Sequence, residues 1–94
     1  MSDSDRNTRR LIYRGTVQGV GFRMTVRRIA GRFAVAGFVR NLPDGTVELV
    51  ARGAAKEIDG FLSAVDEAMA GYIRSVDETA PGPEEVPAGF EIRP

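Results

Sequence analysis

The chain has 94 residues, of which 43% are hydrophobic and 28% are charged. These values are typical of an ordinary soluble globular protein, and so short a chain has enough apolar residues for only one core. Cysteine and histidine are both absent, which excludes disulfides, thiolate and imidazole metal sites, a cysteine nucleophile and a Ser-His-Asp triad. Any catalysis must therefore use the remaining polar side chains and backbone amides.

The formal net charge of zero conceals an asymmetry between the two halves of the chain. Residues 1–52 hold ten arginines against four acids, whereas residues 53–94 hold three basic residues against nine acids. A basic half suits an anionic ligand such as a phosphate or a nucleic acid, although solvated faces of different elements would give the same pattern. No apolar run approaches the roughly 18 residues that span a bilayer, and the charged segment 1–10 does not resemble a signal peptide. We therefore expect a cytoplasmic protein without membrane contact.

The N-terminal half begins with a polar stretch and continues into regular structure. Residues 1–9 are expected to form a disordered tail, and residues 10–94 a single domain. The β-branched and aromatic segment 11–17 predicts a first strand. A glycine-containing turn follows at 18–21, and apolar residues at helical spacing then predict a helix over 23–34. The arginines of this helix take its other faces, as in a surface helix with one buried stripe.

The remaining segments complete an alternation of strands and helices. Segments 37–41 and 46–52 flank the turn signal Pro43-Asp44-Gly45, which predicts a β-hairpin. The elements that follow are an amphipathic helix, a strand, a proline-rich loop and a short edge strand, over residues 55–70, 72–77, 78–89 and 90–92. This order predicts an α+β, ferredoxin-like βαββαβ sandwich, with an antiparallel four-stranded sheet, a fifth edge strand and two helices on one face. Fold alone does not fix function.

The segment Gln18-Gly19-Val20-Gly21-Phe22-Arg23 lies where the first strand meets the first helix. Two glycines separated by one residue let backbone N–H groups turn inward around an anion, and the start of a helix favours the same anion. The planar guanidinium of Arg23 can bind phosphoryl oxygens. The segment lacks the third glycine of a dinucleotide-binding motif and the Gly-Lys-Ser/Thr of a Walker loop. It therefore predicts either an anion site or only a tight strand-to-helix turn.

Asn41, at the end of the second predicted strand, is a second candidate. Its uncharged amide both donates and accepts hydrogen bonds, so it can orient a water molecule without being a base. In the predicted topology this strand end could face the loop that carries Arg23. Asparagine before Leu-Pro-Asp-Gly is also a common turn residue, and the spacing leaves both interpretations open.

Taken together, the segments Val17–Arg23 and Gly37–Asn41 closely resemble the paired signature of the acylphosphatase family. The resemblance extends through the predicted hairpin into the second helix, over roughly residues 10–78. It implies a ferredoxin-like hydrolase that cleaves acyl phosphates to a carboxylate and inorganic phosphate, with no metal or other cofactor. Phe38 stands where the family usually has Trp or Tyr, and the segment after the second helix departs from the family pattern.

The resemblance also implies roles for individual residues. The arginine matching Arg23 binds the phosphoryl group and the asparagine matching Asn41 positions the attacking water. The substrate-binding residues that accompany them belong to the loop and are Gln18, Gly19, Val20, Gly21 and Phe22. An acyl phosphate has a good leaving group and a loose transition state, so positioning and charge stabilisation suffice for its hydrolysis. We expect a monomer that acts on a small molecule, is inhibited by inorganic phosphate and binds no nucleic acid.

Other functions share this element order. RNA-recognition domains have it too, and the basic half of the chain suits a polyanion, but segment 46–52 lacks the aromatic side chains that such domains stack on bases. Acylphosphatase-like domains also occur within larger hydrogenase-maturation carbamoyltransferases. A regulatory domain for a small anionic ligand is a further alternative. Because the sequence ends at Pro94, we expect a free-standing enzyme, and the presence of both Arg23 and Asn41 argues against a catalytically inactive regulatory domain.

Overall fold

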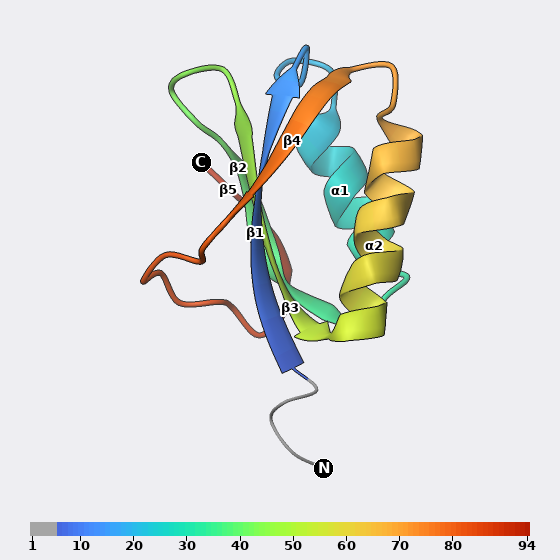
Figure 1. Ribbon diagram of the computed structural model, residues 1–94, viewed down its shortest axis with the longest axis vertical. Helices are drawn as coiled ribbons and strands as arrows, with labels where there is room; N and C mark the ends of the chain where they lie inside the picture. The colour runs from blue at the N-terminus through green and yellow to red at the C-terminus, as the bar shows by residue number, and fades with distance from the viewer. Residues whose placement is uncertain (1–5) are drawn as a thin grey trace.

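A five-stranded sheet forms one layer of the molecule, and two helices cover one of its faces (Figure 1). The computed structural model describes residues 6–94, with elements β1 (Arg6–Gly15), α1 (Phe22–Ala30), β2 (Val35–Asn41), β3 (Val47–Ala54), α2 (Ala55–Ala68), β4 (Ile73–Thr79) and β5 (Phe90–Arg93). The strand order is β4-β1-β3-β2-β5, and all pairs are antiparallel except β2 with β5. The predicted ferredoxin-like fold with an added edge strand is therefore confirmed.

The first strand starts earlier than the sequence predicts. Residues 6–9, which were expected to belong to the tail, pair with the end of β3, and residues 1–5 lie outside the described part of the chain. The charged residue Arg9 is satisfied there by distant carboxylates, with N–O distances of 2.8 Å to both Glu78 and Asp59. A polar strand of this kind cannot be distinguished from a disordered tail by its own composition, because the residues that stabilise it lie far away in the sequence.

Further boundaries differ from the prediction by a few residues, most of all the end of α1. α1 ends at Ala30 instead of continuing to residue 34, and residues 31–34 form turns. There the backbone N–H groups bond to carbonyls three residues back, as in Phe33 to Ala30 at 3.1 Å, which is the tighter geometry of helix ends. β4 continues two residues into the predicted loop, because Glu78 and Thr79 pair with β1.

The core lies between the sheet and the helices. Alternate residues of the strands, such as Leu11 and Leu49, meet the apolar stripes of both helices. Phe61 of α2 is fully buried in this layer, and burying a side chain of its size stabilises the fold by about 1.5–3 kcal/mol. Neither helix within residues 6–94 combines the length and apolar character that crossing a membrane requires.

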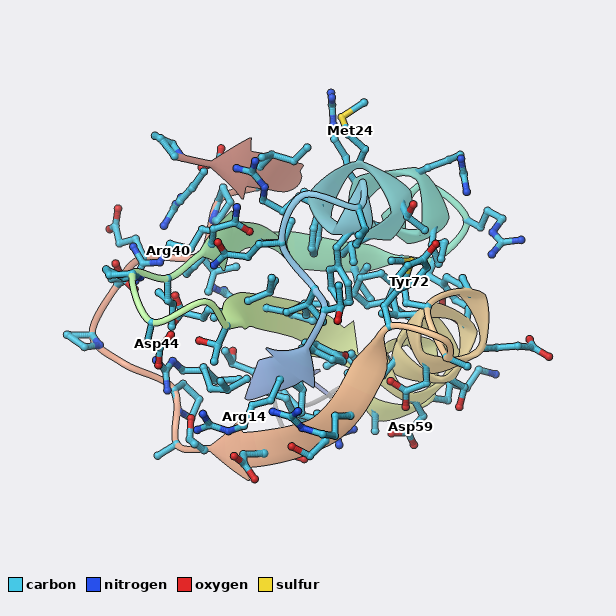
Figure 2. All side chains as sticks on the ribbon, turned by 90° about the horizontal axis from the view of Figure 1, so that it is seen from above. Arg14, Met24, Arg40, Asp44, Asp59 and Tyr72 are labelled. Carbon is cyan, nitrogen blue, oxygen red and sulfur yellow. The ribbon has the colours of Figure 1, made fainter. Side chains whose placement is uncertain are left out.

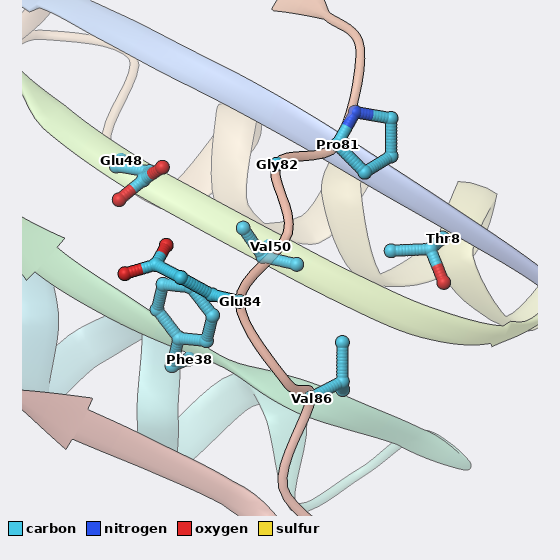
Figure 3. A pocket seen from close by; sticks show the side chains of 8 residues that line it. All are labelled: Thr8, Phe38, Glu48, Val50, Pro81, Gly82, Glu84 and Val86. Carbon is cyan, nitrogen blue, oxygen red and sulfur yellow. The ribbon is translucent and has the colours of Figure 1, made fainter.

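The opposite face of the sheet is covered by the proline-rich segment 80–89, which we call the strap. It crosses this face after β4 and returns to the edge as β5 (Figure 1). Figure 3 shows the strap residue Glu84 beside Phe38, over a small cavity between strap and sheet. The carboxylate of Glu84 pairs with Arg40 of β2 at 3.0 Å. The segment that the sequence predicts as a plain loop is therefore a cover for the second sheet face.

Glu48 of β3 is a buried carboxylate under the strap, with 1% of its side chain exposed. Arg10 of β1 and Arg40 of β2 each donate to it at 2.5 Å from opposite sides. These charge-assisted bonds join three neighbouring strands across the sheet.

Candidate active site

The loop between β1 and α1 depends on two glycines in the left-handed region. Gly19 has φ +79° and Gly21 has φ +77°, a conformation that side chains with a Cβ rarely adopt. A Cβ at either position would have open space around it, so the requirement for glycine is conformational and not steric. The prediction of inward-turning backbone at these two positions agrees with this geometry.

Gly21 is also the N-cap of α1. Its carbonyl accepts the first helical bond, from the N–H of Thr25 at 3.0 Å. The N–H groups of Phe22, Arg23 and Met24 consequently have no partner within the helix. The first turn contains no acidic residue and the cap contributes no side-chain hydrogen bond. Free donors and the positive end of the helix dipole therefore coincide at this point, which favours an anion.

A cavity of about 100 Å³ opens beside this helix start. The residues that line it come from the loop, the first turn of α1 and the end of β2, and are Val17, Gly19, Gly21, Phe22, Arg23, Met24 and Asn41. Five of the seven residues predicted for the site are thus brought together. Asn41 reaches the cavity because side chains alternate along β2: it shares a face with Val39, which is buried under the helices, whereas Arg40 faces the strap.

Gln18 and Val20 are predicted site residues that do not line the cavity. The side-chain amide of Gln18 instead donates to the carbonyls of Leu42 and Thr46, at 2.9 and 2.8 Å. These carbonyls belong to the turn between β2 and β3, directly after Asn41, so Gln18 joins the glycine loop to the strand end that carries Asn41. Val20 is partly buried and packs against the core.

Phe22 lines the cavity but belongs mainly to the core, with 2% of its surface exposed. Its ring packs at a tilt on that of Tyr13, with 5.1 Å between centroids. Burial raises the pKa of the Tyr13 phenol far above its usual value, so this side chain stays neutral beneath the loop. The aromatic pair therefore anchors the start of α1 without adding a charge to the site.

Arg23 is the cation of the cavity, and it is half-buried. Within residues 6–94, no carboxylate forms an ion pair with it. A guanidinium in this state retains its donors for an incoming anion, and its planar fork matches two phosphoryl oxygens.

Two residues of the cavity, Val17 and Met24, were not predicted from the sequence. Val17 is buried and reads as an ordinary strand residue. Met24 is 65% exposed and points away from the molecule (Figure 2). Met24 lies off the apolar stripe of α1 and next to Arg23, and this position is the one feature of the sequence that could have indicated its place in the cavity.

The turn opposite the glycine loop is held by Asp44. Both the hydroxyl and the backbone N–H of Thr46 donate to the Asp44 carboxylate, at 2.6 and 3.1 Å. These hydrogen bonds hold the pKa of Asp44 below its usual value, so its carboxylate stays ionised at neutral pH and continues to accept them. The hairpin that ends β2 is thereby fixed from inside by Asp44 and from the loop by Gln18.

A ferredoxin-like sandwich with an arginine, a carboxamide and free helix N–H groups around one cavity defines an anion-binding protein suited to a phosphoryl group. Comparison with known proteins specifies the class further. The family model described as acylphosphatase matches residues 9–92, and the chain therefore belongs to the acylphosphatase family.

Individual relatives agree with this assignment. The chain is 38% identical over 92 residues to an acylphosphatase of Synechococcus sp. (strain JA-2-3B'a(2-13)), with 97% of each chain covered. It is 48% identical over 62 residues to an acylphosphatase of Bordetella parapertussis, and this match spans 66%, just under two thirds, of each chain. The crystal structure of acylphosphatase from Bacillus subtilis superimposes with a TM-score of 0.76 at 32% identity, covering 92% of this chain and 97% of that one.

Proposed function

We propose that the chain hydrolyses the carboxyl–phosphate bond of acyl phosphates, giving a carboxylate and inorganic phosphate. The observation that carries this proposal is that Arg23, Asn41 and the glycine loop line one cavity at the start of α1. The chain contains no histidine or cysteine, so the reaction depends on positioning and charge stabilisation. These two effects suffice for hydrolysis of an activated phosphate, but not for hydrolysis of a phosphate monoester.

Arg23 and the backbone amides of the loop hold the phosphoryl group. The guanidinium binds two of its oxygens, and the free N–H groups at the start of α1 donate to the others. Negative charge on these oxygens is retained through a loose transition state, so fixed donors around them stabilise it. The left-handed conformations of Gly19 and Gly21 support this role, because residues of this kind let neighbouring N–H groups form an anion-binding concavity.

Asn41 positions the attacking water. Its carboxamide oxygen accepts a hydrogen bond from the water and thereby aims a lone pair at phosphorus. The water oxygen forms the new bond to phosphorus while the bond from phosphorus to the acyl oxygen breaks, and a water proton passes to the phosphate produced. The carboxylate departs unprotonated because the pKa of a carboxylic acid is about 4, so no general acid is needed.

Further properties follow from the same proposal. Inorganic phosphate fits the cradle that the phosphoryl group uses, so it inhibits competitively. Arg23, Asn41 and the glycine loop meet within a single chain, and we propose that the monomer is active. The cytoplasmic location and the lack of nucleic-acid binding predicted from the sequence stay predictions.

The test is hydrolysis of benzoyl phosphate in the presence of EDTA by the wild type and by Arg23→Lys and Asn41→Ala. Arg23→Lys is expected to lose about 100-fold or more in kcat/KM, as when an enzyme loses stabilising donors. Asn41→Ala is expected to lose about 100-fold or more because the attacking water is no longer positioned. Arg32→Lys, outside the cavity, is the matched control and keeps its activity. Circular dichroism checks that the variants fold. Activity that requires a metal, or activity on p-nitrophenyl phosphate with none on acyl phosphates, would contradict the proposal.

A further inference from the structure

Most arginines of the strands form ion pairs with acids, whereas those of α1 do not. The paired strand arginines are Arg9, Arg10, Arg14, Arg40 and Arg93; Arg52 and Arg74 form no ion pair with any residue of 6–94. In α1 and the turn after it, Arg23, Arg27, Arg28 and Arg32 form none either. Four arginines without an acidic partner among the described residues therefore lie together along α1 and the turn that follows it.

Part of this charge borders a second hollow that adjoins the proposed active site. It is lined by Met24, Arg27, Arg28 and Gly31 and measures about 470 Å³. The spacing of these residues puts them on one face of α1. Met24 lines both hollows, so they adjoin at this residue, whose side chain is exposed (Figure 2).

The distances along α1 suit one extended ligand. Arg27 follows Arg23 by four residues, which is about 6 Å along the helix axis. A ligand whose phosphoryl group is bound at Arg23 can therefore extend its acyl group over Met24 and reach the guanidinium groups beyond it. Apolar atoms of the acyl group would contact the Met24 thioether, and a group at the far end would meet Arg27 and Arg28.

We propose that Arg27 and Arg28 form a subsite for a second anionic group, a carboxylate or a phosphate, at the far end of the acyl group. The inference rests on the proposed function, since it places the phosphoryl group of the same molecule at Arg23. Preferred substrates are thus acyl phosphates with two anionic ends. The helix dipole also favours cations in the last turn of α1, where both residues lie. That role alone predicts an effect on stability and none on substrate choice.

The experiment compares two substrates of equal size, 4-carboxybenzoyl phosphate and its uncharged analogue 4-carbamoylbenzoyl phosphate. The wild type is expected to show a KM roughly three- to fivefold lower for the carboxylate, the range that exposed ion pairs provide. In Arg27→Gln/Arg28→Gln the ratio of the two KM values falls to about one, with kcat of both substrates affected alike, because the contact is present before and during the reaction. Raising the salt concentration reduces the wild-type ratio in the same way.

Arg32→Gln is the control, since it removes one positive charge just beyond α1 at a residue that does not line the hollow. It is expected to keep the wild-type ratio. Glutamine has nearly the helix propensity of arginine, and a thermal melt reports any loss of stability separately. A ratio of about one in the wild type, or a ratio unchanged in the double variant, overturns the subsite while leaving the hydrolase intact. If neither substrate is hydrolysed, the proposed function itself fails.

Discussion

The hydrogen bonds of Gln18 give a prediction that distinguishes a positioning role from direct substrate contact. Its amide donates to the carbonyls of Leu42 and Thr46 at 2.9 and 2.8 Å, and we expect Gln18→Ala to lose both bonds. A typical intramolecular hydrogen bond contributes about 0.5–1.5 kcal/mol to the free energy of unfolding. The variant should therefore be less stable by about 1–3 kcal/mol.

The lower part of that range is favoured by what the two carbonyls retain. The carbonyl of Thr46 still accepts from the N–H of Leu42 at 2.9 Å, and that of Leu42 from the N–H of Gly45 at 3.1 Å. Neither oxygen is left without a partner, so the penalty of a buried unsatisfied acceptor does not arise. We expect about 1–2 kcal/mol, with a fall in melting temperature of about 4–8 °C for each kcal/mol in a domain of this size.

Gln18→Glu extends the test. It keeps the length of the side chain but replaces the two donors with a carboxylate that faces two carbonyl oxygens, so its loss of stability exceeds that of Gln18→Ala. Urea denaturation measures both variants, with Glu67→Ala on the exposed face of α2 as the control. If the denaturation midpoints of both Gln18 variants match the wild type, the hairpin does not depend on Gln18 and the reasoning is refuted. Both variants should also raise KM, because the glycine loop and the end of β2 are no longer joined.

Two further predictions concern charged groups away from the cavity. Glu48→Gln should lower the free energy of unfolding by about 1–3 kcal/mol, because it leaves Arg10 and Arg40 without their shared carboxylate. The loss is limited because both arginines are partly exposed. An unchanged urea midpoint would contradict this prediction. The side chain of Arg9 holds the pKa of Glu78 below its usual value of 4.5. The stabilisation from this pair is therefore complete above pH 4.5 and is lost as the pH falls through the lower folded pKa. Glu78→Gln should flatten the acid limb of a melting-temperature curve below that pH, and an acid limb as steep as the wild type's would show that the pair contributes nothing.

The order of elements could be predicted because apolar periodicity is local. The stripes of both helices and the hairpin signal around Asp44 are visible in short windows of sequence, and the structure confirms the fold that they indicate. The start of β1 could not be predicted in this way. Its polar residues are stabilised by Glu78 and Asp59, and pairing between residues so far apart leaves no local pattern.

The candidate site divides in the same manner. Gly19 and Gly21 could be recognised because positive φ requires glycine at a turn of this kind. The function of the Gln18 side chain could not, since whether an amide faces a ligand or a backbone carbonyl depends on how closely the hairpin approaches. The contribution of Met24 to the cavity likewise depends on the position of α1 relative to the loop.

The strap shows a third kind of limit. Its prolines and acids predict an irregular segment, which is correct for residues 80–89. The course of that segment over the sheet depends on the ion pair between Glu84 and Arg40. Arg40 lies in β2, and nothing in the sequence of either segment indicates that the two residues meet. A charged residue in a loop does not reveal which of many arginines it pairs with.

The central claim is that water attacks phosphorus in a cavity formed by Arg23, Asn41 and the glycine loop, and isotope labelling tests it most directly. Benzoyl phosphate is hydrolysed by the wild type in ¹⁸O-labelled water with EDTA present, and the products are separated and analysed by mass spectrometry. The account predicts one labelled oxygen in inorganic phosphate and none in benzoate, because the bond from phosphorus to the acyl oxygen is the one that breaks. Label in benzoate would show attack at the carbonyl carbon and would contradict the account, and so would an absence of hydrolysis.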